Sequence, residues 1–248
     1  MLKIFAKFLM FFGTIFLIGT VARAQVTIDS LTQTTKPVYA GIVNNFYKKV
    51  GIQARVYNGI AYDFYDPAIQ GNAYFKDVNH WKTGTVIYDG YNYSNVSLMY
   101  DIYADEVIML YNNHFLKISL LSNQVSSFDL LGNHFIYIKN DPANNLTTGF
   151  YNELYHGKMQ VLAHYSKSIQ TNNDISGNII SYFNPGKDYY LFKDGKYYKV
   201  NSQGTFLNLL KDHKKQIREF IRANNIKYKN SPEEAMASIA AHYDNLSN

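Results

Sequence analysis

Short runs of alternating apolar and polar residues, separated by turn signals, fill the stretch from Trp81 to Ile138. In one run, Leu116, Ile118 and Leu120 share a face and polar residues lie between them. This period of two indicates half-buried β-strands. Because two-residue loops join such runs, the strands can pair only antiparallel, since a parallel crossover needs about a dozen residues. The stretch predicts an antiparallel β-meander.

Residues that tolerate a left-handed backbone mark the predicted turns. Asp89-Gly90 and Asp194-Gly195 are the strongest signals, because a type I′ hairpin turn needs positive φ at both central residues. Polar, turn-rich composition predicts loops at 63–75, 141–149 and 170–181. Further strand breaks are expected at Ala104-Asp105, Asn112-Asn113, Ser122-Asn123, Gly132-Asn133 and His156-Gly157.

After residue 204 the apolar period changes from 2 to 3.6. An amphipathic helix with a Lys/Arg face is predicted over 206–222. A second helix is predicted to begin at the N-cap Ser231, with Pro232 at its first position and Glu234 completing a capping box. The fold class is therefore mainly β (α+β): an antiparallel β-meander that forms a curved sheet, open barrel or sandwich, with two C-terminal amphipathic helices.

The N-terminal sequence predicts export. Lys3 and Lys7 precede an apolar run over 8–21, and Ala22-Arg23-Ala24 fits the small-x-small pattern of a signal-peptidase site. The alternative is an uncleaved anchor, but this run is shorter than the roughly 20 residues that a spanning helix needs. We expect cleavage near Ala24 and a periplasmic or extracellular protein. The predicted segments are a signal peptide (1–24), a flexible N-terminal arm (25–35), a β-rich domain (36–203) and a helical pair packed on it (204–248).

Charge and cysteine content narrow the function classes. Lys3, Lys7 and Arg23 account for three of the five excess positive charges, so the exported chain has no basic footprint for nucleic acid. Residues 205–230 hold seven basic and two acidic residues, which makes peripheral membrane contact through helix 206–222 an alternative to a solvated face. The absence of cysteine excludes a thiol nucleophile, a thiolate metal site, disulfides and a lipid-carrying cysteine.

The sequence carries no motif for hydrolases, metalloproteases or nucleotide binding. The seven histidines never stand at i and i+4 on one predicted element, so we expect no metal and no cofactor. Asp101, Asp105 and Glu106 cluster at a turn but lack the spacing of a Ca²⁺ loop. Asp63 and Asp66 could form a glycosidase pair, although Asp66 before proline is most simply a turn initiator. We expect a non-enzymatic protein with no catalytic residue.

Aromatic residues crowd the segment before the meander. Exposed rings in such a loop can stack on sugars or hold a peptide, and the alternative is that they pack in the core. The candidate ligand-binding residues are Tyr57, Tyr62, Tyr65, Tyr74 and Trp81.

Several motifs follow one another between Arg55 and Leu246: V-Y-N-G-x-x-Y, D-P-x-I-x-G-x-x-Y-F, W-x-x-G-x-V-x-Y-D-G-x-x-Y, L-x-Y-D-I-Y-x-D-E-V, G-F-Y-x-x-L-Y-x-G-K, Y-Y-L-x-K-D-G-K-Y-Y and L-L-K-D-x-K-K-x-I-R-x-F-I. Their order resembles a family of uncharacterised exported proteins from Bacteroidetes-type Gram-negative bacteria. The resemblance implies export and a single structural unit, and it implies no reaction, ligand or catalytic residue.

Together these features predict an exported cell-envelope protein whose β-domain binds or scaffolds an envelope component. A periplasmic carrier of an apolar ligand such as a lipid is one alternative, because a curved sheet closed by helices can enclose a cavity. A glycan- or peptide-binding module is another, and a hydrolase is the least favoured. The oligomeric state is left open.

Overall fold

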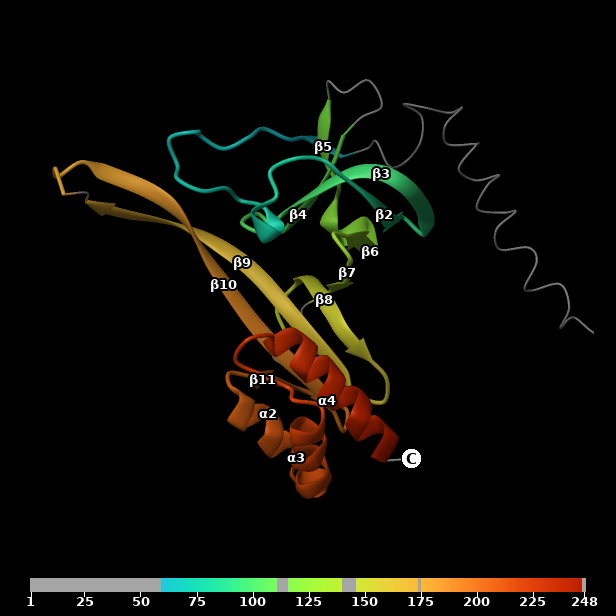
Figure 1. The fold of residues 1–248 in the computed structure, drawn as a ribbon. Helices are drawn as coiled ribbons and strands as arrows, with labels where there is room; N and C mark the ends of the chain where they lie inside the picture. The colour runs from blue at the N-terminus through green and yellow to red at the C-terminus, as the bar shows by residue number, and fades with distance from the viewer. Residues whose placement is uncertain (1–58, 111–115, 140–145, 174, 247–248) are drawn as a thin grey trace, which may run out of the picture. The chain divides into compact units, whose positions relative to one another are not determined.

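A computed structural model describes residues 59–110, 116–139, 146–173 and 175–246, all within one compact unit, Ala40–Asn248. Eleven strands form one antiparallel sheet in the order β1-β5-β4-β3-β2-β6-β7-β8-β9-β10-β11, and the sheet does not close (Figure 1). The predicted mainly β meander is confirmed. The strands are β1 (Ile60–Ala61), β2 (Lys82–Tyr88), β3 (Tyr91–Asp101), β4 (Glu106–Leu110), β5 (Lys117–Ser119), β6 (Val125–Leu130), β7 (Asn133–Ile138), β8 (Gly149–His156), β9 (Gln160–Asn173), β10 (Ile179–Lys193) and β11 (Lys196–Val200).

Left-handed residues form the tight hairpins where the sequence places Asp-Gly. Asp89 and Gly90 have φ of 50° and 78°, and Asp194 and Gly195 have 53° and 78°. The turn between β6 and β7 lies one residue earlier than predicted, at Leu131 and Gly132. The predicted break at Asn112-Asn113, the signal peptide and the N-terminal arm lie outside the described residues.

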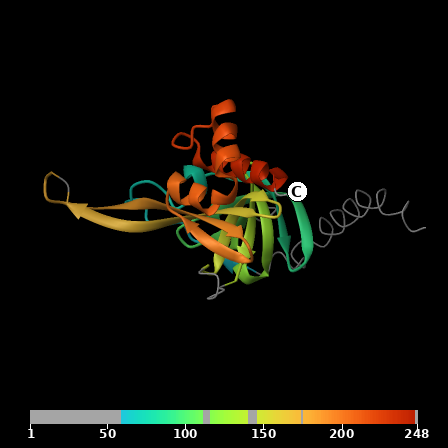
Figure 2. The same cartoon turned by 90° about the horizontal axis from the view of Figure 1, so that it is seen from below.

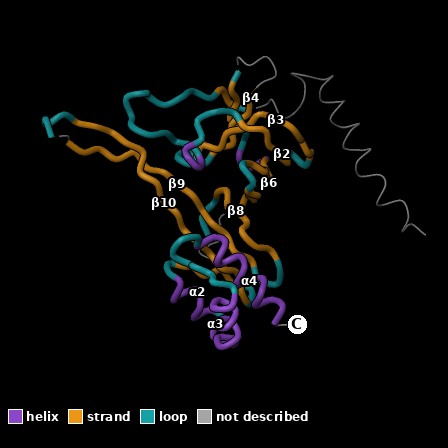
Figure 3. Tube along the Cα trace, viewed as in Figure 1, coloured by secondary structure: helices purple, strands orange, loops and turns teal. Residues whose placement is uncertain are grey.

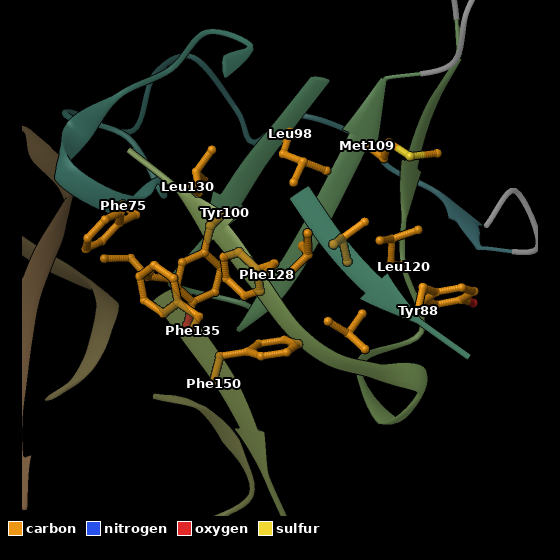
Figure 4. Packing of buried hydrophobic residues seen from close by; sticks show 14 of the residues in the cluster. Phe75, Tyr88, Leu98, Tyr100, Met109, Leu120, Phe128, Leu130, Phe135 and Phe150 are labelled. Atoms are coloured by element: carbon orange, nitrogen blue, oxygen red, sulfur yellow. The ribbon is translucent and has the colours of Figure 1, made fainter. Parts of the chain in front are cut away.

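The first half of the sheet curls around an aromatic core. Five residues separate β5 from β6, yet β6 pairs with β2, on the far side of the β2–β5 meander. Such a short connection requires the intervening strands to bend toward each other. The rings of Phe128 and Phe135 stack at 4.6 Å in the interior, and Phe150 meets Phe128 edge-on at 5.2 Å (Figure 4). Among the described residues, packed aromatic side chains therefore lie inside the curl.

The strands β9 and β10 have 14 and 15 residues and pair as far as Asn173 and Ile179. We call their outer part, residues 166–186, the long hairpin; it extends beyond the rest of the sheet (Figures 1 and 3). The predicted loop at 170–181 is therefore wrong over most of its length. Apart from the half-buried Ile180, the described residues of 170–181 are polar or exposed, so this segment lacks the alternation that marks a half-buried strand.

Three α-helices, not two, follow the sheet: α2 (Gln203–Leu209), α3 (Lys214–Ala223) and α4 (Pro232–Leu246). The predicted helix 206–222 is interrupted by a 3₁₀ turn, Lys211–His213. Tyr243 of α4 donates a hydrogen bond to Asp212 in this turn, so a tertiary contact accompanies the break in helical periodicity.

The helices lie on one face of the sheet at its β8–β11 end (Figure 2). Phe206, Ile217 and Ile239, from successive helices, pack with Val161 and Leu191 of β9 and β10. None of the helices in the described ranges is long and apolar enough to cross a membrane.

Candidate binding site at the base of the long hairpin

The tyrosine loop, which we define as residues 62–81, lies along the long hairpin. Gln70 bridges to Tyr182 of β10: its amide donates to the Ser181 carbonyl at 2.9 Å, and its own carbonyl accepts from the Phe183 amide at 3.0 Å. The rings of Tyr65, Tyr103 and Phe183 then meet edge to face, with centroids 5.3–5.7 Å apart. Segments distant in sequence thus form one surface at the base of the hairpin.

Asp101 anchors the tyrosine loop from below. This side chain is fully buried at the end of β3 and accepts four hydrogen bonds. The Tyr62 and Tyr65 hydroxyls donate to Oδ2 at 2.8 and 2.7 Å, and the Tyr103 and Ala104 amides donate to Oδ1 at 2.8 and 3.0 Å. Burial, together with the Asp101 carboxylate, raises the pKa of Tyr62 and of Tyr65 far above the ordinary value for tyrosine. Both hydroxyls therefore keep their protons and act as donors.

The structure places the candidate ligand-binding residues unevenly. Tyr62 and Tyr74 are buried, with 7% and 5% of their surface exposed, and their hydroxyls lie 3.3 Å apart. Trp81 is half-buried against the same cluster, and Tyr57 lies outside the described residues. Tyr65 and Tyr74 border a pocket of about 380 Å³ beside Phe64 and Phe183, which we call the loop pocket. Ligand binding by these residues stays a prediction.

Lys167 of β9 fixes the tyrosine loop from the side. Its side chain is only 5% exposed, and its ammonium donates to the Asn72 carbonyl at 2.6 Å, the Tyr74 carbonyl at 3.2 Å and Asp77 Oδ1 at 2.6 Å. An ammonium has three protons, so these acceptors use all of its donors. Lys167 thus serves as a structural clamp between the hairpin and the loop.

The clamp holds an unusual backbone turn. Lys76 and Asp77 both have left-handed φ, 54° and 57°. This conformation is uncommon for residues other than glycine and costs roughly 1–2 kcal/mol per residue. The side-chain amide of Asn72 donates to the Asp77 backbone carbonyl at 3.1 Å, and this bond holds the turn together with Lys167.

A second hollow, the hairpin-base pocket, opens beside this turn. Its volume is about 430 Å³, within the range of small-molecule sites. Its lining residues come from the tyrosine loop, the loop after β3, both strands of the hairpin and the start of α4: Phe75, Lys76, Asp77, Ile102, Tyr165, Lys167, Pro185, Gly186, Lys187 and Glu233.

Sequence reasoning missed the hairpin-base pocket. Its three lysines lie far apart in the sequence and form no motif. Glu233 lies in another part of the chain, helix α4, so the sequence gives no sign that it is near them. The local feature that marks the pocket is the turn in which two successive residues, Lys76 and Asp77, have positive φ. This feature can be recognised from the structure but not from the sequence.

The carboxylates at the turn after β3 have separate partners. Asp105 accepts from the Tyr100 hydroxyl at 2.6 Å and from the Phe150 amide at 3.1 Å, and Glu106 accepts from the Ser119 hydroxyl at 2.7 Å. Burial raises the pKa of Asp105 and lowers that of nearby His164, which favours the neutral form of each.

Asp66 accepts from the Ala68 amide at 2.8 Å, as a turn initiator does. Within the described ranges no three such side chains are grouped to hold a metal.

Replacing Lys167 with methionine, which keeps the aliphatic stem, is expected to lower the free energy of unfolding by about 2–3 kcal/mol, because two carbonyls and a carboxylate lose a charged donor. Lys187→Met is the matched control. Its ion pair with Glu233 is more exposed and should contribute at most about 1 kcal/mol. Urea unfolding of both variants measures the difference, and equal losses would show that Lys167 is not a clamp.

Comparison with known protein-family models, curated proteins and solved structures gave no match.

Proposed function

We propose that this chain is an exported, non-enzymatic binding or scaffolding protein of the cell envelope, and that it holds its partner through the long hairpin. The proposal rests chiefly on the hairpin tip. Ile175 is fully exposed and Ile179 is 77% exposed, at the end of a ribbon that extends beyond the sheet (Figure 1). Apolar side chains presented in this way are suited to burial by a partner.

The backbone of the hairpin supports the same proposal. At the inner end of the hairpin, the Lys167 amide donates to the Ile102 carbonyl at 3.0 Å. Residues 168–173 of β9 pair with β10 on one side. On the other side, no strand in the described part of the chain pairs with them. Exposed edges normally carry charges that prevent pairing with other chains, yet residues 166–186 contain only Lys167 and Asp174 as charged residues. The edge is therefore suited to accept a strand from a partner.

Export and envelope location rest on the N-terminal sequence and on the family resemblance. A non-enzymatic role is supported by the sequence, which carries no motif for hydrolases, metalloproteases or nucleotide binding. The carrier alternative would need space inside the curled sheet, where packed aromatic side chains lie, and we do not propose it.

A second candidate is glycan or peptide binding at the loop pocket. The exposed ring of Phe64 and the half-buried ring of Tyr65 favour it, because aromatic faces bordering a pocket can stack on sugars. Phe64→Ala would then abolish binding to a glycan array without a stability loss of more than about 0.5 kcal/mol, as is usual for surface substitutions.

The test of the main proposal is site-specific photocrosslinking in cells. The photoreactive residue p-benzoylphenylalanine is placed at Ile175 or Ile179, and at Tyr91 as a control on another exposed turn. We expect one discrete adduct from the two hairpin positions and none from Tyr91. With the photoreactive residue at Gln170, the double substitution Ile175→Thr and Ile179→Thr should remove the adduct and change Tm by no more than a few degrees. The same adduct from Tyr91, or none from the hairpin, would contradict the proposal.

A further inference from the structure

The hairpin-base pocket has two chemically different sides. Phe75, Ile102 and Tyr165 are nearly fully buried, at 3%, 6% and 6% exposure, and form its deep side. Lys76 and Lys187 are exposed and lie at its outer side. A molecule that fills this space meets apolar surface at one end and ammonium groups at the other.

The ion pairs around the pocket leave one positive charge uncompensated. Asp77 pairs with Lys167 at 2.6 Å, and Glu233 pairs with Lys187 at 2.6 Å. The remaining lysine, Lys76, has no carboxylate within ion-pair distance in the described chain, and its ammonium lies 5.2 Å from the centre of the Phe75 ring. The pocket therefore carries a net charge of +1, located where its charged and apolar sides meet.

The backbone holds that charge in place at an energetic cost. Lys76 and Asp77 both have positive φ, a conformation that aspartate adopts more readily than lysine. The strain in this turn therefore lies mainly at Lys76. Lys167 and Asn72 together hold the turn in this form. Strained backbone of this kind is found preferentially at binding and active sites, where the surrounding structure maintains it.

The ammonium of Lys187 borders the pocket from the opposite strand. It lies 5.0 Å from the centre of the Tyr165 ring, which belongs to the deep side. An anion near Lys76 and Lys187 would thus have apolar rings directly beside it. Apolar walls exclude water and strengthen the attraction between opposite charges.

We propose that the hairpin-base pocket binds a small organic monocarboxylate. Its carboxylate pairs with Lys76, and its ring or short hydrocarbon chain lies against Phe75, Ile102 and Tyr165. A net charge of +1 suits a monoanion better than a phosphate dianion, and the apolar deep side gives an inorganic anion no contact. This site is separate from the hairpin tip, so either proposal can fail without the other.

Titration of the full-length exported chain with benzoate, followed by ¹H–¹⁵N NMR, tests the proposal. We expect benzoate to shift the amide signals of Lys76, Asp77, Ile102 and Gly186. Benzamide, the neutral analogue of the same shape, should bind at least tenfold more weakly. Inorganic phosphate should leave the four signals unchanged at the same concentrations.

Two variants identify the charged partner. Lys76→Gln should weaken benzoate binding at least tenfold, and Lys215→Gln, on the exposed face of α3, should leave it unchanged. Because Lys76 makes no ion pair, its variant is expected to keep the wild-type spectrum away from the pocket. Equal binding of benzoate and benzamide, shifts that avoid these amides, or equal weakening by the two variants would each overturn the proposal.

Discussion

Replacing Asp101 with alanine is expected to lower the free energy of unfolding by about 3–5 kcal/mol. The substitution leaves the buried Tyr62 hydroxyl, the half-buried Tyr65 hydroxyl and two partly buried backbone amides without their acceptor, and each unsatisfied buried donor costs about 1–3 kcal/mol. The hydroxyls can rotate toward other acceptors, but the amides of Tyr103 and Ala104 cannot. Urea unfolding at neutral pH measures the loss.

Two milder variants serve as controls for Asp101. Asp101→Asn keeps an oxygen for the amides of Tyr103 and Ala104 and should cost clearly less than the alanine variant. Tyr65→Phe removes a single donor and should cost about 1 kcal/mol. If Asp101→Ala costs less than 1.5 kcal/mol, which is about the worth of one hydrogen bond, this carboxylate does not anchor the tyrosine loop.

The contact between Asp101 and the tyrosines shows what the sequence could not predict about the site. Asp101 stands beside Asp105 and Glu106 in the sequence, which suggests an acidic cluster, and the tyrosines of 62–74 suggest an exposed aromatic surface. In the fold, Asp101 and Asp105 accept hydrogen bonds from different tyrosines, and Tyr62 and Tyr74 are buried. These hydrogen bonds and this burial depend on contacts between residues far apart in the sequence, which neither composition nor local spacing predicts.

Local chemistry predicted the turns and much of the meander. Asp89-Gly90 and Asp194-Gly195 form hairpins because their left-handed backbone is a property of the dipeptide itself. The long hairpin was missed for the opposite reason. Residues 170–173 are exposed, so no alternation records which face they present, and the pairing of Asn173 with Ile179 comes from the extension of a sheet that begins in the core.

The strand order gives a comparable lesson. Alternation indicated that β2 to β7 pair antiparallel, but it could not show that β6 joins β2 on the side away from β3. The five-residue connection from β5 to β6 makes the curl necessary, and the curl then buries Val107, Leu120 and Phe128 in one cluster. In the described part of the chain, packed aromatic side chains lie inside the curl, and the pockets that the proposals use lie at the base of the long hairpin.

The packed aromatic cluster predicts a large cost for removing one ring from it. Phe135 is fully buried, stacks on Phe128 and meets Phe75 and Tyr100 at 5.1 and 5.0 Å. Phe135→Ala is expected to lower the free energy of unfolding by about 3–5 kcal/mol, because the cavity it leaves is walled by rings that cannot collapse into it. Phe135→Leu should cost roughly half as much.

The same variant separates a solid core from a carrier cavity. An apolar cavity the size of a benzene ring stays dry and binds benzene, so saturating benzene should raise the Tm of Phe135→Ala by several degrees. The wild-type protein should show no such shift, because the rings of Phe75, Phe128 and Phe135 already occupy this space. A benzene-induced rise in the wild-type Tm, or a cost below 1.5 kcal/mol for Phe135→Ala, would indicate room for an apolar ligand and revive the carrier function.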